Sequence, residues 1–182
     1  ASFYLESLIN YNYNIIATFS QPPRKKGRGM KIEESAVQKL AQSNKIKSFT
    51  PKNLEDFDTK KLIESLCPDL IVVMGYGIKI PSTILKIPKY GCINVHVSLL
   101  PRWRGAAPIE HAILNGDTKT GVTVFKLIEK MDAGPTIKSK SIIIESHYNK
   151  LELTKQLNII GTRLLNSVIP LIFENKIIFQ IQ

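Results

Sequence analysis

The 182-residue sequence contains only two cysteines, three histidines and one tryptophan, and it is short of acidic side chains. Cys67 and Cys92 have no neighbouring Cys or His at the spacing of metal ligands, so we expect neither a metal site nor a disulfide framework. Both cysteines lie beside apolar runs, where free cysteine behaves as a small hydrophobe. We therefore expect both to be reduced core residues.

Long hydrophobic runs and low-complexity linkers are also absent from the sequence. No apolar stretch reads as long enough to span a bilayer, and the N-terminus lacks the basic, apolar and small-residue order of a secretory signal. These absences predict a cytoplasmic protein with no membrane partner. With 43% hydrophobic residues, the chain can bury one sizeable core and suits a single domain.

The charge of the chain is strongly positive. Its 25 Lys and Arg residues against 15 Asp and Glu residues give a formal net charge of +10 and a pI near 9.6. Such a balance favours a polyanionic partner such as nucleic acid. A composition rich in Lys, Ile and Asn can also reflect an AT-rich genome, so the charge supports this interpretation without deciding it.

Hydrophobic periodicity predicts alternating strands and helices along the chain. The predicted strands cover 14–19, 45–49, 70–74, 91–98, 121–128 and 142–144. The predicted helices cover 3–10, 32–43, 59–66, short segments opening at 82 and 108, and 149–175, broken or kinked at Pro170. This order predicts an α/β fold with a mostly parallel sheet and helices on both faces, whose ligands bind beyond the carboxyl ends of the strands.

The segment from Cys92 to Gly105 carries the clearest chemical signal. Asn94 and His96 stand two residues apart at the end of a predicted strand, so both side chains point to one face. An amide beside an imidazole suits a carbonyl that becomes tetrahedral while a proton leaves an attacking nitrogen. The pair therefore indicates acyl transfer, although a single histidine near a strand end is more often an ordinary polar residue.

Asp132 lies at a sharp turn between two predicted strands. Its carboxylate could accept a hydrogen bond from the imidazole, fix the tautomer and hold the ring charged. Asp and Gly also dominate ordinary turns, so Asp132 with Ala133 and Gly134 could be turn chemistry alone. The combination of motifs has to decide between these interpretations.

The order Asn-x-His-x-Ser-Leu-Leu-Pro-x-x-Arg-Gly, then Gly-Val-Thr, then Met-Asp-Ala-Gly resembles the folate-dependent formyltransferases. Two further stretches, Arg104-Gly-Ala-Ala-Pro-Ile and Phe19-Ser-Gln-Pro-Pro-Arg-Lys-Lys-Gly-Arg-Gly, are similar to the methionyl-tRNA formyltransferases of bacteria. The resemblance implies a Rossmann-like formyltransferase fold. It also implies transfer of a formyl group from 10-formyltetrahydrofolate to the amino group of initiator methionyl-tRNA, without a metal, by a monomeric enzyme.

The resemblance assigns roles to particular residues. Asn94, His96 and Asp132 become the catalytic set. The folate pocket would be lined by Ser98, Leu99, Leu100 and Pro101, and also by Gly75, Tyr76 and Gly77, for which a plain turn is an equal alternative. A mobile cationic loop would contact tRNA phosphates through Arg24, Lys25, Lys26, Arg28 and Lys31, with a solvated charge run as the alternative. Trp103 is either a rim aromatic or helix-entry packing, and His111 and His147 are expected at the surface.

The same resemblance sets the expected domain organisation. Residues 1–176 would form the catalytic domain without the family's usual first strand, and 177–182 would begin a linker to a C-terminal domain. Two alternative functions stay open. One is a folate-dependent formyltransferase acting on a small amine, such as glycinamide ribonucleotide or an amino-sugar nucleotide. The other is an inactive nucleic-acid-binding remnant.

Overall fold

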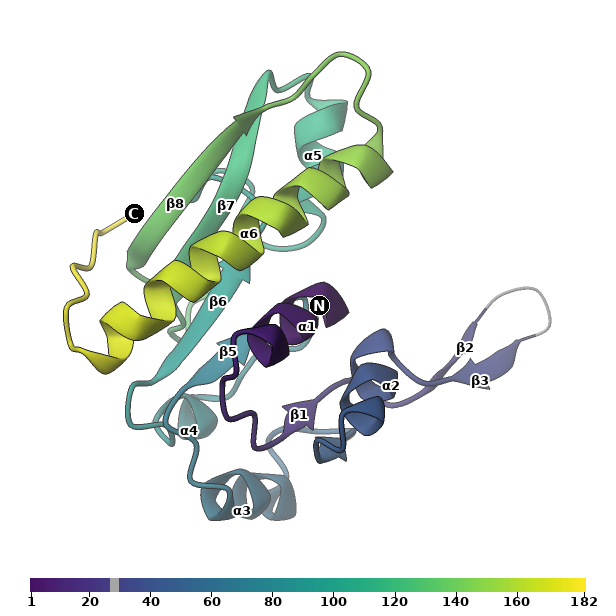
Figure 1. The fold of residues 1–182 in the computed structure, drawn as a ribbon, viewed down its shortest axis with the longest axis vertical. Helices are drawn as coiled ribbons and strands as arrows, with labels where there is room; N and C mark the ends of the chain where they lie inside the picture. Colours follow the sequence, from purple (N-terminus) through teal and green to yellow (C-terminus); the bar gives the residue numbers. More distant parts are fainter. Residues whose placement is uncertain (27–29) are drawn as a thin grey trace. The chain divides into compact units, whose positions relative to one another are not determined.

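The computed structural model describes residues 1–26 and 30–182, which form two compact units, Ala1–Pro68 and Asp69–Gln182, called unit 1 and unit 2 below. Figure 1 labels their elements. Unit 1 contains α1 (Ser2–Asn10), β1 (Thr18–Phe19), β2 (Arg24–Lys26), β3 (Lys31–Glu33), α2 (Ala36–Ser43), β4 (Ser48–Phe49) and α3 (Phe57–Ser65). Unit 2 contains β5 (Ile71–Val73), α4 (Ser82–Leu85), β6 (Cys92–His96), α5 (Pro108–Leu114), β7 (Lys119–Lys126), β8 (Thr136–Ile143) and α6 (Lys150–Phe173).

Unit 1 is built on a short parallel strand pair. β1 pairs with β4 in the register that sets Phe19 opposite Phe49, and the two rings lie 5.2 Å apart between their centres. Helix α2 packs on both strands, and α1 packs on α2. The two strands lie inside the ranges predicted from sequence but are shorter, because only two residues of each enter the ladder.

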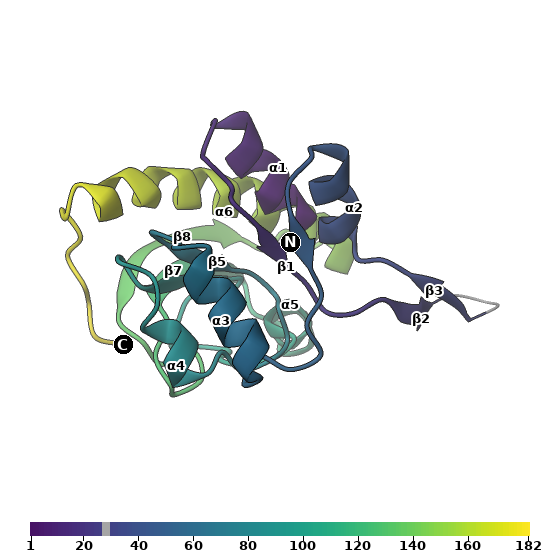
Figure 2. The same cartoon turned by 90° about the horizontal axis from the view of Figure 1, so that it is seen from below.

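Strands β2 and β3 pair antiparallel and form a ribbon that projects from the rest of unit 1 (Figure 2). The predicted helix start at Ile32 is therefore wrong, since Lys31–Glu33 is a strand. The helix begins only at Ala36 because the Ser35 hydroxyl accepts the backbone N–H of Gln38 at 3.0 Å and caps the first turn.

Unit 2 is built on a four-stranded sheet in the order β5-β6-β7-β8. β5 and β6 are parallel, whereas β6–β7 and β7–β8 are antiparallel. The sheet is thus mixed, which corrects the expectation of mostly parallel pairing. The last two strands are joined by segment 127–135, which is too short for the crossover of a dozen or more residues that a parallel pair needs.

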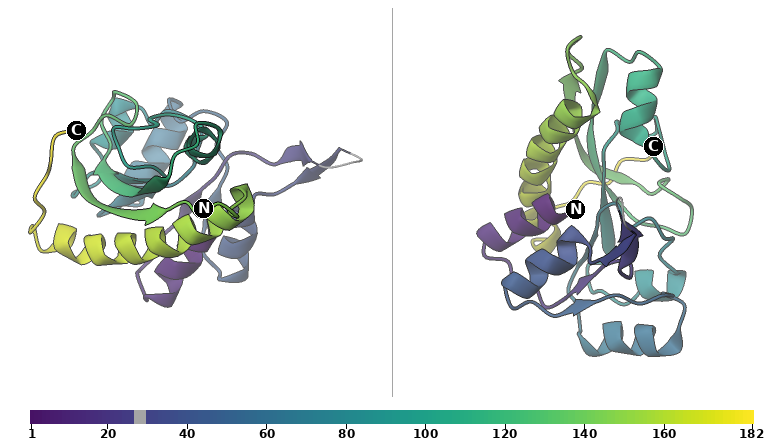
Figure 3. Two further views of the ribbon diagram at one scale, coloured as in Figure 1. Left: turned by 90° about the horizontal axis from the view of Figure 1, so that it is seen from above. Right: turned by 90° about the vertical axis from the view of Figure 1, so that its right-hand side faces the viewer.

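Helix α6 supplies the core of unit 2. Asn149 and Glu152 form a reciprocal capping box at its start. Its apolar face packs on β7 and β8 (Figure 3), and Leu153, Leu157 and Leu165 are completely buried. The helix continues through Pro170, contrary to the predicted break, because burial of the neighbouring Val168, Ile169 and Ile172 outweighs the helical hydrogen bond that proline removes.

By length and composition α6 is long and apolar enough to cross a membrane, whereas the sequence predicted no stretch of that length. Half of its most apolar window is buried inside the protein. The helix packs on β7, β8 and α5, so α6 acts here as the core helix of unit 2.

Candidate active site

Strand β6 places Asn94 and His96 on the same face of the unit 2 sheet, as their spacing predicts. In the ladder Asn94 lies opposite Phe125 of β7, and His96 lies opposite Thr123. The His96 ring meets the Phe125 ring edge-on, with 6.5 Å between the centres. The intervening Val95 is buried on the other face, as the alternation of a strand requires.

Both ring nitrogens of His96 face an oxygen atom. Nε2 lies 2.8 Å from the carbonyl oxygen of Trp103, and Nδ1 lies 3.7 Å from Oδ2 of Asp132. A carbonyl oxygen can only accept, so Nε2 carries a proton whether the ring is neutral or charged. Nδ1 is therefore the nitrogen that can gain or lose a proton, and it does so beside a carboxylate.

Asp132 is held by the turn between β7 and β8. Its backbone has a φ of 45°, in the left-handed region that Asp tolerates better than most residues. The Gly105 N–H donates to Oδ2 at 2.8 Å, and the Gln182 amide donates to the Asp132 carbonyl oxygen at 3.1 Å. At Gly134 a Cβ atom would overlap the Lys126 carbonyl oxygen, so this turn needs glycine. Asp132 therefore lies within ion-pair distance of His96, but at 3.7 Å from Nδ1 it is too far for the hydrogen bond expected from the sequence.

The Asn94 side chain has a buried hydrogen-bond acceptor that the described residues leave unused. Its Oδ1 atom is buried and has no hydrogen-bond partner among the residues that the structure describes. A buried acceptor without a partner costs about 1–3 kcal/mol, so such a group is rare unless a ligand or water satisfies it. An attacking amine carries N–H donors of the required kind, which makes this amide chemically suited to an amine substrate.

The segment after β6 forms a tightly bonded loop. Ser98 is fully buried, and its hydroxyl donates to the Arg102 carbonyl oxygen at 2.6 Å, so it shapes the loop from within. Leu99 extends over Gly121, where a Cβ atom would lie 2.6 Å from the Leu99 side chain. The Leu100–Pro101 peptide bond is cis. Residues 98–101 therefore stand directly beyond the His96 end of the strand.

Thr123 ties this loop to the sheet, a role that sequence reasoning missed. Its hydroxyl donates to the Ser98 carbonyl oxygen at 2.7 Å and accepts the Leu100 N–H at 3.1 Å. Thr123 is almost completely buried, at 1% exposure, so these two bonds have no competition from bulk water. The Gly-Val-Thr motif was the available signal, because it contains both Thr123 and the Gly121 under Leu99.

The loop of Gly75, Tyr76 and Gly77 begins just after β5, whose Val73 pairs with Asn94. Gly75 and Gly77 have φ values of 54° and 75°, which L side chains rarely adopt. A Cβ atom at Gly75 would meet no atom within 4 Å, so there is open space beside it. Burial raises the pKa of the Tyr76 phenol. The loop thus starts next to the candidate catalytic amide.

The predicted tRNA-binding residues belong to unit 1, in the β2–β3 ribbon. Arg24 and Lys31 are exposed on β2 and β3. Lys25 and Lys26 lie on β2, and Arg28 lies outside the described residues. The expected mobile loop is therefore wrong for 24–26 and for Lys31, which are strand residues, because the two segments satisfy each other's backbone groups by pairing.

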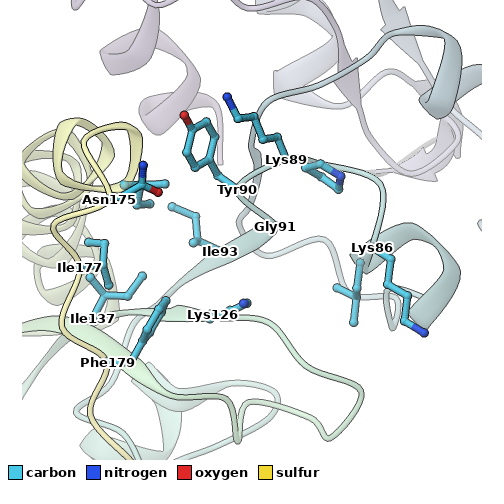
Figure 4. Close-up of a pocket in the computed structure, with 13 residues that line it drawn as sticks. Lys86, Lys89, Tyr90, Gly91, Ile93, Lys126, Ile137, Asn175, Ile177 and Phe179 are labelled. Atoms are coloured by element: carbon cyan, nitrogen blue, oxygen red, sulfur yellow. The ribbon is translucent and has the colours of Figure 1, made fainter.

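A cleft of about 560 Å³ opens at the other end of β6, next to Gly91 and Ile93 (Figure 4). Ile137, Ile177 and Phe179 form apolar walls, and the remaining lining includes Lys86, Lys89 and Lys126. None of the candidate catalytic residues lines this cleft. In the part of the chain that the structure describes, no group of three His, Cys, Asp or Glu side chains is placed to hold a metal ion.

The two cysteines differ in their surroundings. Cys92 is buried in β6, and this burial raises the pKa of its thiol to about 12. Cys67 is exposed after α3, which corrects the expectation that both are core residues. Its backbone follows the last turn of the helix in a left-handed conformation, with a φ of 46°, and this turns the side chain outward.

Comparison with known families identifies the family of the chain. The family described as "Formyl transferase" matches residues 5–169, which include the whole segment from β6 to the Asp132 turn. The chain belongs to the formyl transferase family. This match bears out the resemblance seen in the Asn94–Arg104 segment and places every predicted site residue of this formyltransferase inside the family's domain.

Relatives with curated names share 37–43% of their residues with this formyltransferase. A methionyl-tRNA formyltransferase of Nitrosomonas eutropha is 37% identical over 95% of this chain and 55% of its own. A methionyl-tRNA formyltransferase of Bartonella henselae is 43% identical over 88% of this chain and 52% of its own. The chain thus spans about half the length of the curated relatives it matches.

Solved structures give the fold. A phosphoribosylglycinamide formyltransferase of Anaplasma phagocytophilum superposes with a TM-score of 0.81 at 21% identity, covering 96% of this chain and 83% of that one. A glycinamide ribonucleotide transformylase of Symbiobacterium toebii gives the same TM-score at 16% identity, covering 99% and 89%. At these identities the likeness concerns the fold alone, and it confirms the predicted α/β, Rossmann-like formyltransferase fold.

Proposed function

We propose that this formyltransferase moves the formyl group of 10-formyltetrahydrofolate to the α-amine of initiator methionyl-tRNA in translation initiation, as a cytoplasmic monomer. The observation that carries the proposal is the meeting of Asn94, His96 and Asp132 at one end of β6, with an unpaired buried amide oxygen ready for an amine. Identities of 37–43% to relatives named methionyl-tRNA formyltransferase support the choice of acceptor.

In the proposed reaction, the amine nitrogen forms a bond to the formyl carbon while the bond from that carbon to N10 of the folate breaks. The amine loses one proton and N10 gains one, so tetrahydrofolate and formylmethionyl-tRNA are the products. The formyl oxygen carries negative charge when its carbon is tetrahedral. Donors placed for that charge contribute on the order of 3 kcal/mol each in comparable oxyanion sites.

The site assigns an atom to each role. The Asn94 Nδ2 group would donate to the formyl oxygen, while Oδ1 would accept an N–H of the attacking amine. His96 would act through Nδ1, because Nε2 is occupied by the Trp103 carbonyl oxygen. Asp132, 3.7 Å from Nδ1, would stabilise the imidazolium and help relay the amine proton to N10 through water.

We further propose that the folate lies between the two loops that flank the ends of β5 and β6. Leu99, Leu100 and Pro101 would supply apolar contacts, with Ser98 holding their loop from within. The backbone of Gly75, Tyr76 and Gly77 would approach the ligand closely, since there is open space beside Gly75. Both segments adjoin the amide and imidazole where transfer would occur.

The β2–β3 ribbon would contact phosphates of the tRNA. Exposed Arg24 and Lys31 supply charge on neighbouring strands, and Lys25, Lys26 and Arg28 belong to the same basic segment. Among the described residues of the ribbon there is no aromatic side chain on which a base could stack. Contacts of this kind would add affinity and salt dependence, with little reading of sequence.

A formyl transferase for a small amine is the competing function. The structural neighbours named above act on glycinamide ribonucleotide according to their names, and they share the fold at 16–21% identity. We favour the tRNA because the closer sequence relatives are named for it and because the basic ribbon suits a polyanion. Binding of a small substrate would not explain the exposed positive charge of that ribbon.

Incubation of the chain with 10-formyltetrahydrofolate and either methionyl-tRNA or glycinamide ribonucleotide tests the choice directly. We expect formylmethionine after hydrolysis of the tRNA product, and transfer slower by roughly 100-fold or more in His96→Asn. Transfer to glycinamide ribonucleotide alone would identify the small-amine function. Absence of transfer to both acceptors, together with tRNA binding, would identify the inactive remnant and overturn the proposal.

A further inference from the structure

Three side chains stack beside the candidate site. The Arg102 guanidinium lies over the Trp103 ring, 4.3 Å from its centre, and the His111 ring of α5 stacks on Trp103 at 5.2 Å with only 12° between the planes. Trp103 is thus neither a free rim aromatic nor simple helix-entry packing. Its ring contacts both a cation and an imidazole.

Asp117 holds this stack from the loop between α5 and β7. Its carboxylate accepts two hydrogen bonds from Arg102, at 2.6 and 2.9 Å, and one from the Trp103 indole N–H at 2.7 Å. The Asn115 amide adds a fourth bond at 2.9 Å. The hydrogen bond from Arg102 is the main cause that holds the pKa of Asp117 well below its ordinary value. One carboxylate therefore orients two consecutive residues of the loop.

The backbone of Trp103 links this cluster to the catalytic histidine. Its carbonyl oxygen is the acceptor for His96 Nε2, at 2.8 Å. Trp103 has a φ of 58°, a left-handed conformation that is unfavourable for a bulky side chain and persists only where the surroundings enforce it. The bonds to Asp117 and the stack on His111 are the contacts that enforce it.

We propose that Asp117 is a positioning residue for His96. By fixing the Arg102–Trp103 segment, Asp117 holds the Trp103 carbonyl oxygen against Nε2, which keeps the ring proton on Nε2 and leaves Nδ1 free to exchange a proton beside Asp132. Without that carbonyl, the Asp132 carboxylate would draw the proton of the neutral ring to Nδ1, since it is the charged acceptor that faces this nitrogen. The catalytic consequence rests on the proposed function, whereas the tautomer does not.

The tautomer of His96 can be measured on the full chain by two-bond ¹H–¹⁵N correlation NMR at about pH 8.5, two units above the ordinary pKa of histidine. The chain has three histidines, so His111→Gln and His147→Gln spectra assign the His96 signals. We expect the Nε2-protonated form in the unmodified chain. Asp117→Ala should shift the population toward the Nδ1-protonated form, and Asp117→Asn should do so in part.

Glu110→Gln is the matched control, because it removes another surface ion pair, Glu110 to Lys150 at 2.7 Å, that does not touch Trp103. It should leave the His96 tautomer unchanged. If Asp117→Ala fails to fold, Trp103→Phe tests the same link, since it keeps an aromatic ring and removes only the indole donor. Retention of the Nε2-protonated form alone in every folded variant would overturn the proposal.

Kinetics separate the positioning role from the proposed function. A displaced imidazole should lower kcat for formyl transfer by roughly tenfold while KM for the folate stays nearly constant, since loss of alignment acts on the chemical step. A changed tautomer with unchanged kcat would keep the positioning role and count against His96 as the proton carrier. An unchanged tautomer would overturn the positioning role whatever the kinetics show.

Discussion

The loop after β6 and the β2–β3 ribbon carry equally distinctive sequence motifs, yet they differ in how firmly the protein holds them. In the loop, Thr123 and Asp132 form hydrogen bonds with backbone groups, and Asp117 accepts a hydrogen bond from the Trp103 side chain. The ribbon consists of two three-residue strands, and Ile32 in its centre is 71% exposed. The first segment is a rigid part of unit 2, and the second is a thin extension of unit 1.

This difference follows from what each segment is proposed to do. Chemistry on a formyl carbon needs donors held within a fraction of an ångström, because a displacement of about 1 Å can cost a factor of 100 in rate. Attraction between lysines and phosphates acts over roughly 8 Å at physiological salt and tolerates movement. We therefore expect substitutions in the loop to act through geometry and those in the ribbon to act through charge alone.

The largest effect should come from the catalytic pair. His96→Asn and Asn94→Ala should each lower turnover by roughly 100-fold or more while folate affinity stays nearly unchanged, because they remove donors needed mainly in the transition state. Steady-state formyl transfer and folate titration measure the two quantities. His147→Asn, an exposed histidine outside the site, is the control. Comparable turnover in all three variants would contradict the catalytic roles of Asn94 and His96.

A stability measurement tests whether Thr123 holds the loop. Thr123→Val keeps the shape but leaves the Leu100 N–H and the Ser98 carbonyl oxygen without this partner, so unfolding should become easier by about 1–3 kcal/mol. Thr18→Val in unit 1 is the matched control. The buried Thr18 hydroxyl has no hydrogen-bond partner among the described residues, so this change should be neutral or stabilising. Equal losses in denaturant unfolding would contradict the contrast.

The charges of the ribbon should contribute to the salt dependence of tRNA binding. Replacing Arg24, Lys25, Lys26 and Arg28 by Gln should weaken binding and reduce the slope of log K against log salt by about 0.7–0.9 for each phosphate that the protein no longer neutralises. Folate binding should not change. The same number of exposed lysines elsewhere in unit 1, namely Lys39, Lys45, Lys47 and Lys52, serves as a charge-matched control. Identical slopes for both sets would mean that the ribbon is only a solvated charge run.

The smallest effect should be the acid dependence of the Asp117 cluster. Because folding holds the pKa of Asp117 below its ordinary value of 3.8, its contribution to stability is fully present above about pH 4 and is lost as the pH falls further. The difference in unfolding free energy between the unmodified chain and Asp117→Asn should therefore shrink from pH 7 to pH 3. If the difference in unfolding free energy instead grew toward low pH, it would contradict a stabilising role for ionised Asp117.

Much of the site was predictable because it lies on one strand and one turn. The two-residue spacing of Asn94 and His96 fixes their common face, and the Met-Asp-Ala-Gly turn places a carboxylate at the end of a hairpin. Predictions failed where the structure of a segment depends on the segments that pair with it or pack on it. The β2–β3 pairing, the antiparallel β7 and β8, and the continuation of α6 through Pro170 are examples, because local propensity is weaker than pairing and packing in each.

The sequence by itself determined the family, the candidate catalytic residues and the shared face of Asn94 and His96, because family motifs, alternation along a strand and turn chemistry are local properties. Only the tertiary structure decided which nitrogen of His96 is free, since that depends on the Trp103 carbonyl oxygen seven residues away and on Asp132 from another turn. It also revealed Thr123 and Asp117, whose side chains act on a loop distant in sequence. Hydrogen bonds between separate segments leave no periodic trace in the chain, so they emerge only when it has folded.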